Sequence, residues 1–175
     1  MRSRRSKAWS QNELKGLREV LQLLEDDARQ SPAKLGELSG LSAATVRRLI
    51  ERAEADGIIR RYKGIINWEL IGQDRVFAFI EVRAIPERGR GFDAVAERLL
   101  GFPEVHSLYL MSGDYDLHVV VQGETMREVA YFVADKLAPL EGVQSTATHF
   151  VLKRYKVDGD ALEEKEEVRR LPVSL

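Results

Sequence analysis

Arginine side chains gather in one short stretch of the sequence where their spacing could serve nucleic-acid binding. Arg47, Arg48 and Arg52 follow the small residues Ala43 and Ala44. On a helix, residues three and four apart share a face, so these five lie opposite an apolar stripe. The stripe consists of Val46, Leu49, Ile50 and Ala53. Because small residues allow close approach to base edges and arginines reach phosphates or guanine, the stretch predicts a helix that reads the DNA major groove.

Such a helix needs supporting helices, and the preceding residues predict two. Apolar residues at helical spacing predict an amphipathic helix over residues 12–26. Ser31 and Pro32 mark the start of a second helix, because serine caps free amides and proline is tolerated at the first helical position. Gly40 ends that helix, and Ser42 can cap the third helix directly afterwards. This order is typical of a helix-turn-helix.

Residues 58–66, which follow the helix end at Gly57, predict two short strands around Lys63 and Gly64. These strands would form a basic wing and complete a winged helix-turn-helix over residues 12–67. We expect double-stranded DNA as its partner. The candidate DNA-binding residues are Ser42, Ala44, Thr45, Arg47, Arg48, Arg52, Arg61 and Lys63.

From Val76 onwards the apolar period changes to two, which is typical of strands. Strands are predicted over residues 76–85, 105–111, 117–121 and 143–155. Helices are predicted over residues 92–100 and 126–137. The order β-α-β-β-α-β is that of a ferredoxin-like sandwich, so the whole chain is predicted to be an α+β protein.

The first of these strands is apolar on both faces near its start. Ala78 and Ile80 alternate with Phe77 and Phe79. Two helices can cover only one face of a four-stranded sheet, and an uncovered apolar face is typical of a binding surface. The sequence therefore predicts a homodimer formed through this domain.

Four segments taken together resemble the Lrp/AsnC family, the leucine-responsive and asparagine-responsive transcription regulators of bacteria and archaea. They are residues 41–48 with Gly57-Ile58-Ile59, the link 67–72, the turn 113–116 and the strand residues 146–148. The resemblance covers about residues 12–157. It implies a DNA-binding head, a hinge and a ligand-sensing domain that forms dimers and larger assemblies, commonly tetramers or octamers.

The resemblance also implies a small effector, typically an amino acid, that modulates assembly or DNA affinity. Gly113 and Asp116 match the family's G-x-x-D turn, and Thr146 and Thr148 match its T-x-T strand. A carboxylate can hold an α-ammonium group, while hydroxyls and turn amides can hold an α-carboxylate. The candidate effector-binding residues are Met111, Gly113, Asp114, Asp116, Thr146, Thr148, His149 and Phe150.

The formal net charge of -1 is divided unevenly along the chain. Residues 1–72 carry +4, residues 73–157 carry -2, and residues 158–175 carry -3. We therefore expect five parts: a basic flexible arm (1–11), the winged head (12–67), a hinge (68–74), the effector-binding and oligomerisation domain (75–157) and an acidic tail (158–175). The arm could add phosphate contacts, and the tail's glutamates are expected to be solvated.

Composition excludes several classes of site. The 175 residues include no cysteine and three histidines, which leaves no disulfide and little for a metal site. His106 and His118 lie on adjacent predicted strands, but without a third ligand a structural role is favoured. We expect no metal, cofactor or catalytic residue. Because no apolar run is long enough to span a membrane, we expect a cytoplasmic protein. The resemblance to the Lrp/AsnC family further implies association with the nucleoid.

Two other functions remain open. Some proteins with this two-part architecture resemble siroheme decarboxylase subunits, which act on tetrapyrroles, but no nucleophile and base are paired here at a recognisable spacing. The other alternative is an architectural DNA-binding protein without an effector. At single positions, Asp114 and Asp116 could be ordinary turn residues, and the three arginines could form a solvated helix face.

Overall fold

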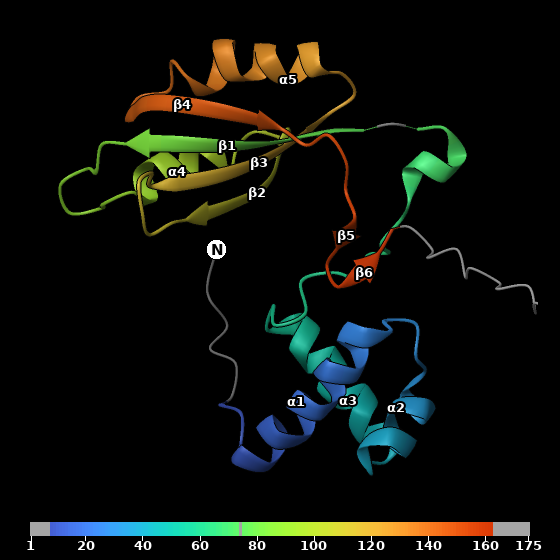
Figure 1. Ribbon diagram of the computed structural model, residues 1–175. Helices are drawn as coiled ribbons and strands as arrows, with labels where there is room; N and C mark the ends of the chain where they lie inside the picture. The colour runs from blue at the N-terminus through green and yellow to red at the C-terminus, as the bar shows by residue number, and fades with distance from the viewer. Residues whose placement is uncertain (1–7, 74, 163–175) are drawn as a thin grey trace, which may run out of the picture. The chain divides into compact units, whose positions relative to one another are not determined.

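The computed structural model describes residues 8–73 and 75–162, and the chain divides between Gly64 and Ile65 into two compact units. The first unit contains α1 (Gln11–Asp26), α2 (Pro32–Ser39) and α3 (Ala43–Ala55) (Figure 1). The three predicted helices are therefore confirmed. The basic residues Arg2, Arg4, Arg5 and Lys7 and the glutamates 163–167 lie outside the described residues.

Serine side chains cap the N-termini of all three helices of the first unit. Ser31 and Ser42 accept hydrogen bonds from the amides of Lys34 and Thr45, as the sequence predicts. Ser10 caps α1 through a capping box, in which its amide donates to the Glu13 carboxylate at 2.9 Å. That amide lowers the pKa of Glu13. These bonds satisfy amides that have no partner within the helix.

The turn between α2 and α3 is held by a close backbone approach. Gly40 takes a left-handed conformation with φ of 70°, and the Leu41 amide donates to the Gly36 carbonyl. A Cβ added at Gly36 would lie 2.6 Å from the Leu41 carbonyl oxygen. The buried apolar residues of the three helices pack around this turn: Leu17, Val20, Leu24, Leu35, Val46, Leu49 and Ala53.

The predicted wing strands are wrong, because residues 58–66 belong to no strand in the structure. The amides of Ile58 and Ile59 both donate to the Ala53 carbonyl and thereby continue the end of α3. Ile65 and Ile66 fall in the second unit. An isolated pair of strands is marginally stable, and no third strand is present here among the described residues of the first unit.

The second unit is the predicted ferredoxin-like sandwich. Its strands are β1 (Val76–Ala84), β2 (Val105–Leu110), β3 (Leu117–Gly123) and β4 (Val143–Phe150), in the antiparallel order β2-β3-β1-β4. Its helices are α4 (Asp93–Leu99) and α5 (Met126–Phe132), the latter extended by a π-helical turn at Val133–Leu137.

The two faces of this sheet differ. Ala78, Ile80 and Val82 of β1 are fully buried and pack with Leu99 of α4 and Phe132 of α5. The residues that alternate with them point to the other face, where Phe79 is 42% exposed. Within the described residues, the helices therefore cover one face of the sheet.

The last strand ends at Phe150, five residues earlier than predicted, and a small hairpin follows (Figure 1). The hairpin pairs β5 (Lys156–Val157) with β6 (Asp160–Ala161). Its loop residues Asp158 and Gly159 both have positive φ, which matches the two-residue turn that favours Asp-Gly. Asp158 and Gly159 therefore belong to an ordered hairpin, although the sequence analysis places them in the acidic tail.

Gly36→Ala should destabilise the first unit by about 1–3 kcal/mol, because the added methyl group meets a backbone oxygen that cannot move freely. Gly16→Ala is the matched control, since its added Cβ would meet only the ends of the flexible Leu41 and Leu49 side chains. The control should change stability by less than about 1 kcal/mol. Urea unfolding of both variants measures the difference, and equal stabilities would contradict the close approach.

Candidate nucleic-acid interface and effector site

The start of α3 presents small and cationic side chains to solvent. Ala44, Arg47 and Arg48 are exposed. Ser42 caps the helix, and its Oγ lies 2.8 Å from the Thr45 Oγ1. The first two turns of α3 therefore combine helix amides, hydroxyls and two exposed arginines, a combination that suits phosphate and base contacts.

Arg52 does not share this exposure. Its guanidinium stacks over the Trp9 ring at 4.0 Å and pairs with Glu13 at 3.1 Å and Asp56 at 3.7 Å. Trp9 in turn donates to Asp56 at 2.9 Å. The side chain of Arg52 is 23% exposed. The structure thus places Arg52 in a network that joins the start of α1 to the end of α3, which the sequence analysis missed because these residues are distant in sequence.

The wing segment carries the other two predicted DNA-binding residues, Arg61 and Lys63, and both are exposed. Between them Tyr62 donates its hydroxyl to Glu54 of α3 at 2.9 Å. Burial and the Glu54 carboxylate raise the pKa of Tyr62, so the hydroxyl stays protonated near neutral pH. This bond ties the basic segment to the exposed side of α3.

The predicted effector turn is anchored to the centre of the sheet. Asp116 accepts a hydrogen bond from the Ala84 amide at 2.8 Å through Oδ2, and its own amide donates to the Val82 carbonyl. The Met111 amide donates to the Asp116 carbonyl, while Asp114 is exposed. Gly113 has φ of 136°, which favours glycine. Asp116 therefore has a structural role, because it fixes the turn to the backbone of β1.

The other predicted effector residues divide between two faces of β4. Thr146 pairs with Val82 and Thr148 with Ile80, so both point to the helix face together with Phe150. His149 pairs with Phe79 and points to the uncovered face, where its Nε2 lies 3.5 Å from Glu81. Since β1 lies between β3 and β4, the threonines and the turn are separated by two strand spacings, roughly 10 Å.

The uncovered face of the sheet is lined by aromatic and histidine side chains. His118 lies 5.4 Å from Phe79 and 6.5 Å from Tyr109 between ring centroids, and its Nδ1 lies 3.4 Å from the Tyr115 hydroxyl. His106 packs edge-on against Phe77 at 5.9 Å. The two histidines thus contact different aromatic rings.

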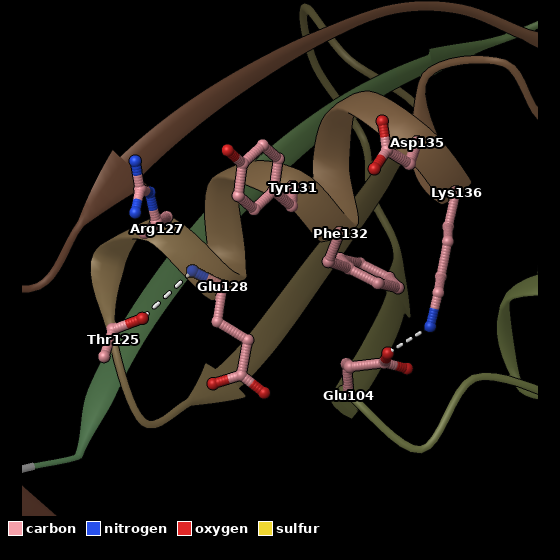
Figure 2. Close-up of a pocket in the computed structure, with 8 residues that line it drawn as sticks. All are labelled: Glu104, Thr125, Arg127, Glu128, Tyr131, Phe132, Asp135 and Lys136. Atoms are coloured by element: carbon pink, nitrogen blue, oxygen red, sulfur yellow. Dashed lines mark hydrogen bonds and ion pairs between the residues drawn. The ribbon is translucent and has the colours of Figure 1, made fainter.

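A separate groove of about 390 Å³ lies beside α5 (Figure 2). Glu104 and Lys136, which both line it, form an ion pair that lowers the pKa of Glu104, and Phe132 lies beside this pair. None of the predicted effector residues lines this groove.

The described residues contain no cluster of three or more acidic, histidine or cysteine side chains that could hold a metal ion. None of the helices in residues 8–73 and 75–162 has the length and apolar character to cross a membrane.

Family models match both units of the chain. Residues 17–60 match a winged helix-turn-helix DNA-binding model, and residues 77–161 match the Lrp/AsnC ligand binding domain. The chain is 43% identical over 157 residues to YugG, an uncharacterized HTH-type transcriptional regulator of Bacillus subtilis. That match covers 89% of this chain and 95% of YugG.

Solved structures with the same fold come from other bacteria. A transcriptional regulator of Neisseria meningitidis, solved as a complex with L-Met, is 27% identical with a TM-score of 0.63, over 86% of this chain and 94% of that one. The leucine response regulatory protein of Mycobacterium tuberculosis is 24% identical with a TM-score of 0.68, over 85% and 98% of the two chains. The second likeness concerns the fold.

Arg52→Met should lower the free energy of unfolding by about 1–2 kcal/mol, because it removes the cation from Trp9, Glu13 and Asp56. Arg47→Met, an exposed control on the same helix, should change it by less than about 0.5 kcal/mol. Urea unfolding tests both. If Arg52→Met kept full stability but lost DNA binding, Arg52 would belong to the interface after all.

Proposed function

The chain belongs to the Lrp/AsnC family of DNA-binding transcriptional regulators with a ligand-binding domain, and from this premise we propose how it reads DNA and senses its effector. The exposed, serine-capped start of α3 carries the proposal for DNA. Ala44, Arg47 and Arg48 contact the major groove there, with Ser42 and Thr45 at the phosphates. Arg61 and Lys63 contact the adjacent backbone.

We propose that the protein acts as a homodimer through the uncovered face of its sheet. Phe79 and Tyr109 are 42% and 54% exposed on that face, although aromatic side chains of this size are usually well buried. A second copy of the same face would cover them by two-fold symmetry. Two recognition helices would then read half-sites about one helical turn apart, and larger assemblies of dimers would contact longer DNA.

We propose that the effector is an amino acid held by the turn at residues 113–116 and by the threonines of β4. The second carboxylate oxygen of Asp116 would bind the α-ammonium group, and the Thr146 and Thr148 hydroxyls would bind the α-carboxylate. These groups are separated by β1 within one chain, so a site that uses both sets is completed at an interface between copies. The likeness to a regulator crystallised with L-Met supports this class of ligand. Met111 and Phe150 would contact the effector side chain.

We propose a regulatory rather than a catalytic role, because the relatives are named as transcriptional regulators. A spectral shift on adding a tetrapyrrole, without retardation of promoter DNA, would instead support the siroheme decarboxylase-like alternative.

Arg48→Ala should weaken binding to a genomically selected DNA fragment by about tenfold and reduce the salt dependence of log K by about one unit, since one phosphate contact is lost. Arg18→Ala removes the same charge from the exposed side of α1 and should have a much smaller effect. Gel retardation over a series of salt concentrations measures both. Unchanged affinity and slope would remove Arg48 from the interface.

Phe79→Glu should raise the dissociation constant of the dimer by at least about thirtyfold, because it would bury an unpaired carboxylate in the interface. The control is Tyr131→Glu, since Tyr131 is 56% exposed on α5, away from the uncovered sheet face. Analytical ultracentrifugation at micromolar concentration distinguishes them. A monomeric wild-type protein, or a dimer insensitive to Phe79→Glu, would contradict this interface.

Calorimetry with the twenty amino acids should identify at least one that binds. Thr148→Val should then weaken its binding by about tenfold through loss of a hydrogen bond. Ser145→Ala, which lies on the opposite face of β4, should leave binding unchanged. No heat from any of the twenty would exclude free amino acids as effectors under those conditions.

A further inference from the structure

We infer that Arg154 is a positioning residue that holds the residues leading into β1 against the C-terminal part of the chain. These residues, 65–75, connect the helix-turn-helix unit to the sheet and are called the linker below. The inference concerns how firmly this linker is held, and its consequence for DNA reading rests on the proposed dimer.

The linker has little apolar burial of its own. It contains one short turn at Trp68–Ile71, in which Leu70 is 81% and Ile71 is 65% exposed. Arg75 stacks over the Trp68 ring at 4.0 Å, but that contact lies within the linker. Since buried apolar surface is the main source of local stability, contacts to other parts of the unit must hold this segment.

The C-terminal hairpin supplies the first of these contacts. The Asn67 side-chain amide donates to the Leu162 carbonyl at 2.7 Å, across 95 residues of sequence. The Leu162 amide donates to the Tyr155 carbonyl, which closes the hairpin next to Arg154. The linker is therefore bonded to the end of the hairpin.

Arg154 supplies the second contact and also reaches the sheet. Its guanidinium carbon lies 4.5 Å from the centre of the Phe77 ring, and its Nη2 lies 3.8 Å from the Glu69 carboxylate. The arginine side chain is only 17% exposed, whereas Glu69 is 52% exposed. A largely desolvated cation gains more from an aromatic ring, while an ion pair to an exposed carboxylate contributes little. The Phe77 stack is therefore the stronger of the two contacts.

The sheet holds Phe77 in place for this stack. Its carbonyl accepts a hydrogen bond from the Val151 amide at 2.8 Å, and its ring packs edge-on against His106. Arg154 thus connects a rigid strand of the sheet to Glu69 of the linker. A firmly held linker limits the range of separations that two DNA-binding units of a dimer can adopt, whereas a loose linker widens it.

Hydrogen exchange measured by mass spectrometry tests the contact without DNA. Arg154→Gln should raise exchange in peptides covering residues 65–73 by about tenfold, the effect of losing one desolvated cation–π contact, while β1 and β3 stay protected. Lys156→Gln is the matched control, because it removes one charge from an exposed residue of β5 and should leave the linker unchanged. If the linker of the Arg154→Gln variant exchanged as slowly as that of the wild type, the inference would be overturned.

Arg154→Lys keeps the test decisive if Arg154→Gln fails to fold. Lysine retains the charge but lacks the planar guanidinium group, so linker exchange should lie between those of the wild type and Arg154→Gln. Exchange equal to that of the wild type would show that the guanidinium stack does not hold the linker.

DNA with two half-sites tests the consequence. Inserting about 5 bp between them, half a helical turn, should weaken wild-type binding strongly and Arg154→Gln binding much less. Equal sensitivity of both proteins, despite faster linker exchange in the variant, would overturn the role in half-site spacing. If the wild type shows no dependence on spacing, the proposed dimeric reading of DNA fails, while the exchange experiment still decides the role of Arg154 in the linker.

Discussion

The packing of α4 and α5 against one face of β1 is the constraint on which the ligand-binding domain depends. Ala78, Ile80 and Val82 are fully buried on that face, and burial of this kind is the main favourable contribution to folding. Because side chains alternate along a strand, the same packing forces Phe77, Phe79 and Glu81 to the opposite face. The aromatic surface proposed for dimerisation is therefore a direct consequence of the core.

The position of β1 also organises the proposed effector site. Asp116 bonds to the backbone of β1 on one side, and Thr146 and Thr148 pair with β1 on the other. In the proposed site, an amino acid that needs both sets of groups therefore uses a second copy of the chain. Assembly and ligand binding would then be linked, since a ligand shifts an equilibrium only through its different affinity for the two states.

The DNA-binding unit is stabilised by different interactions. Serine caps start its three helices, and Gly36 allows the backbone of the following turn to approach closely. Arg52, Trp9 and the carboxylates of Glu13 and Asp56 then tie the first helix to the third. This network takes up Arg52, whereas Arg47 and Arg48 are exposed, as the proposed DNA contacts require. The linker contains a weakly buried turn in which Arg75 stacks on Trp68, and Arg154, itself stacked on Phe77, pairs with Glu69 of the linker.

Local signals in the sequence were sufficient for the helices, the strand order and the family. Ser31, Ser42, Gly40 and the period-two alternation after Val76 act within a few residues, so they can be recognised without knowing the fold. The prediction of wing strands was wrong because strand pairing needs contacts between segments, which the apolar pattern of residues 58–66 cannot show by itself. The amides of Ile58 and Ile59 bond to the end of α3 instead. The predicted end of the last strand was wrong for a similar reason, since β4 is a strand only where it pairs with β1, and this pairing ends near Phe150. Other features depend on residues that are far apart in sequence. They are the partial burial of Arg52, the placement of His149 and Thr148 on opposite faces of β4, and the stack of Arg154 on Phe77. Side-chain chemistry and local backbone preference were thus determined by the sequence alone, whereas the choice of which charged groups face solvent and which are held inside was made by tertiary packing, because desolvation depends on every neighbour in space.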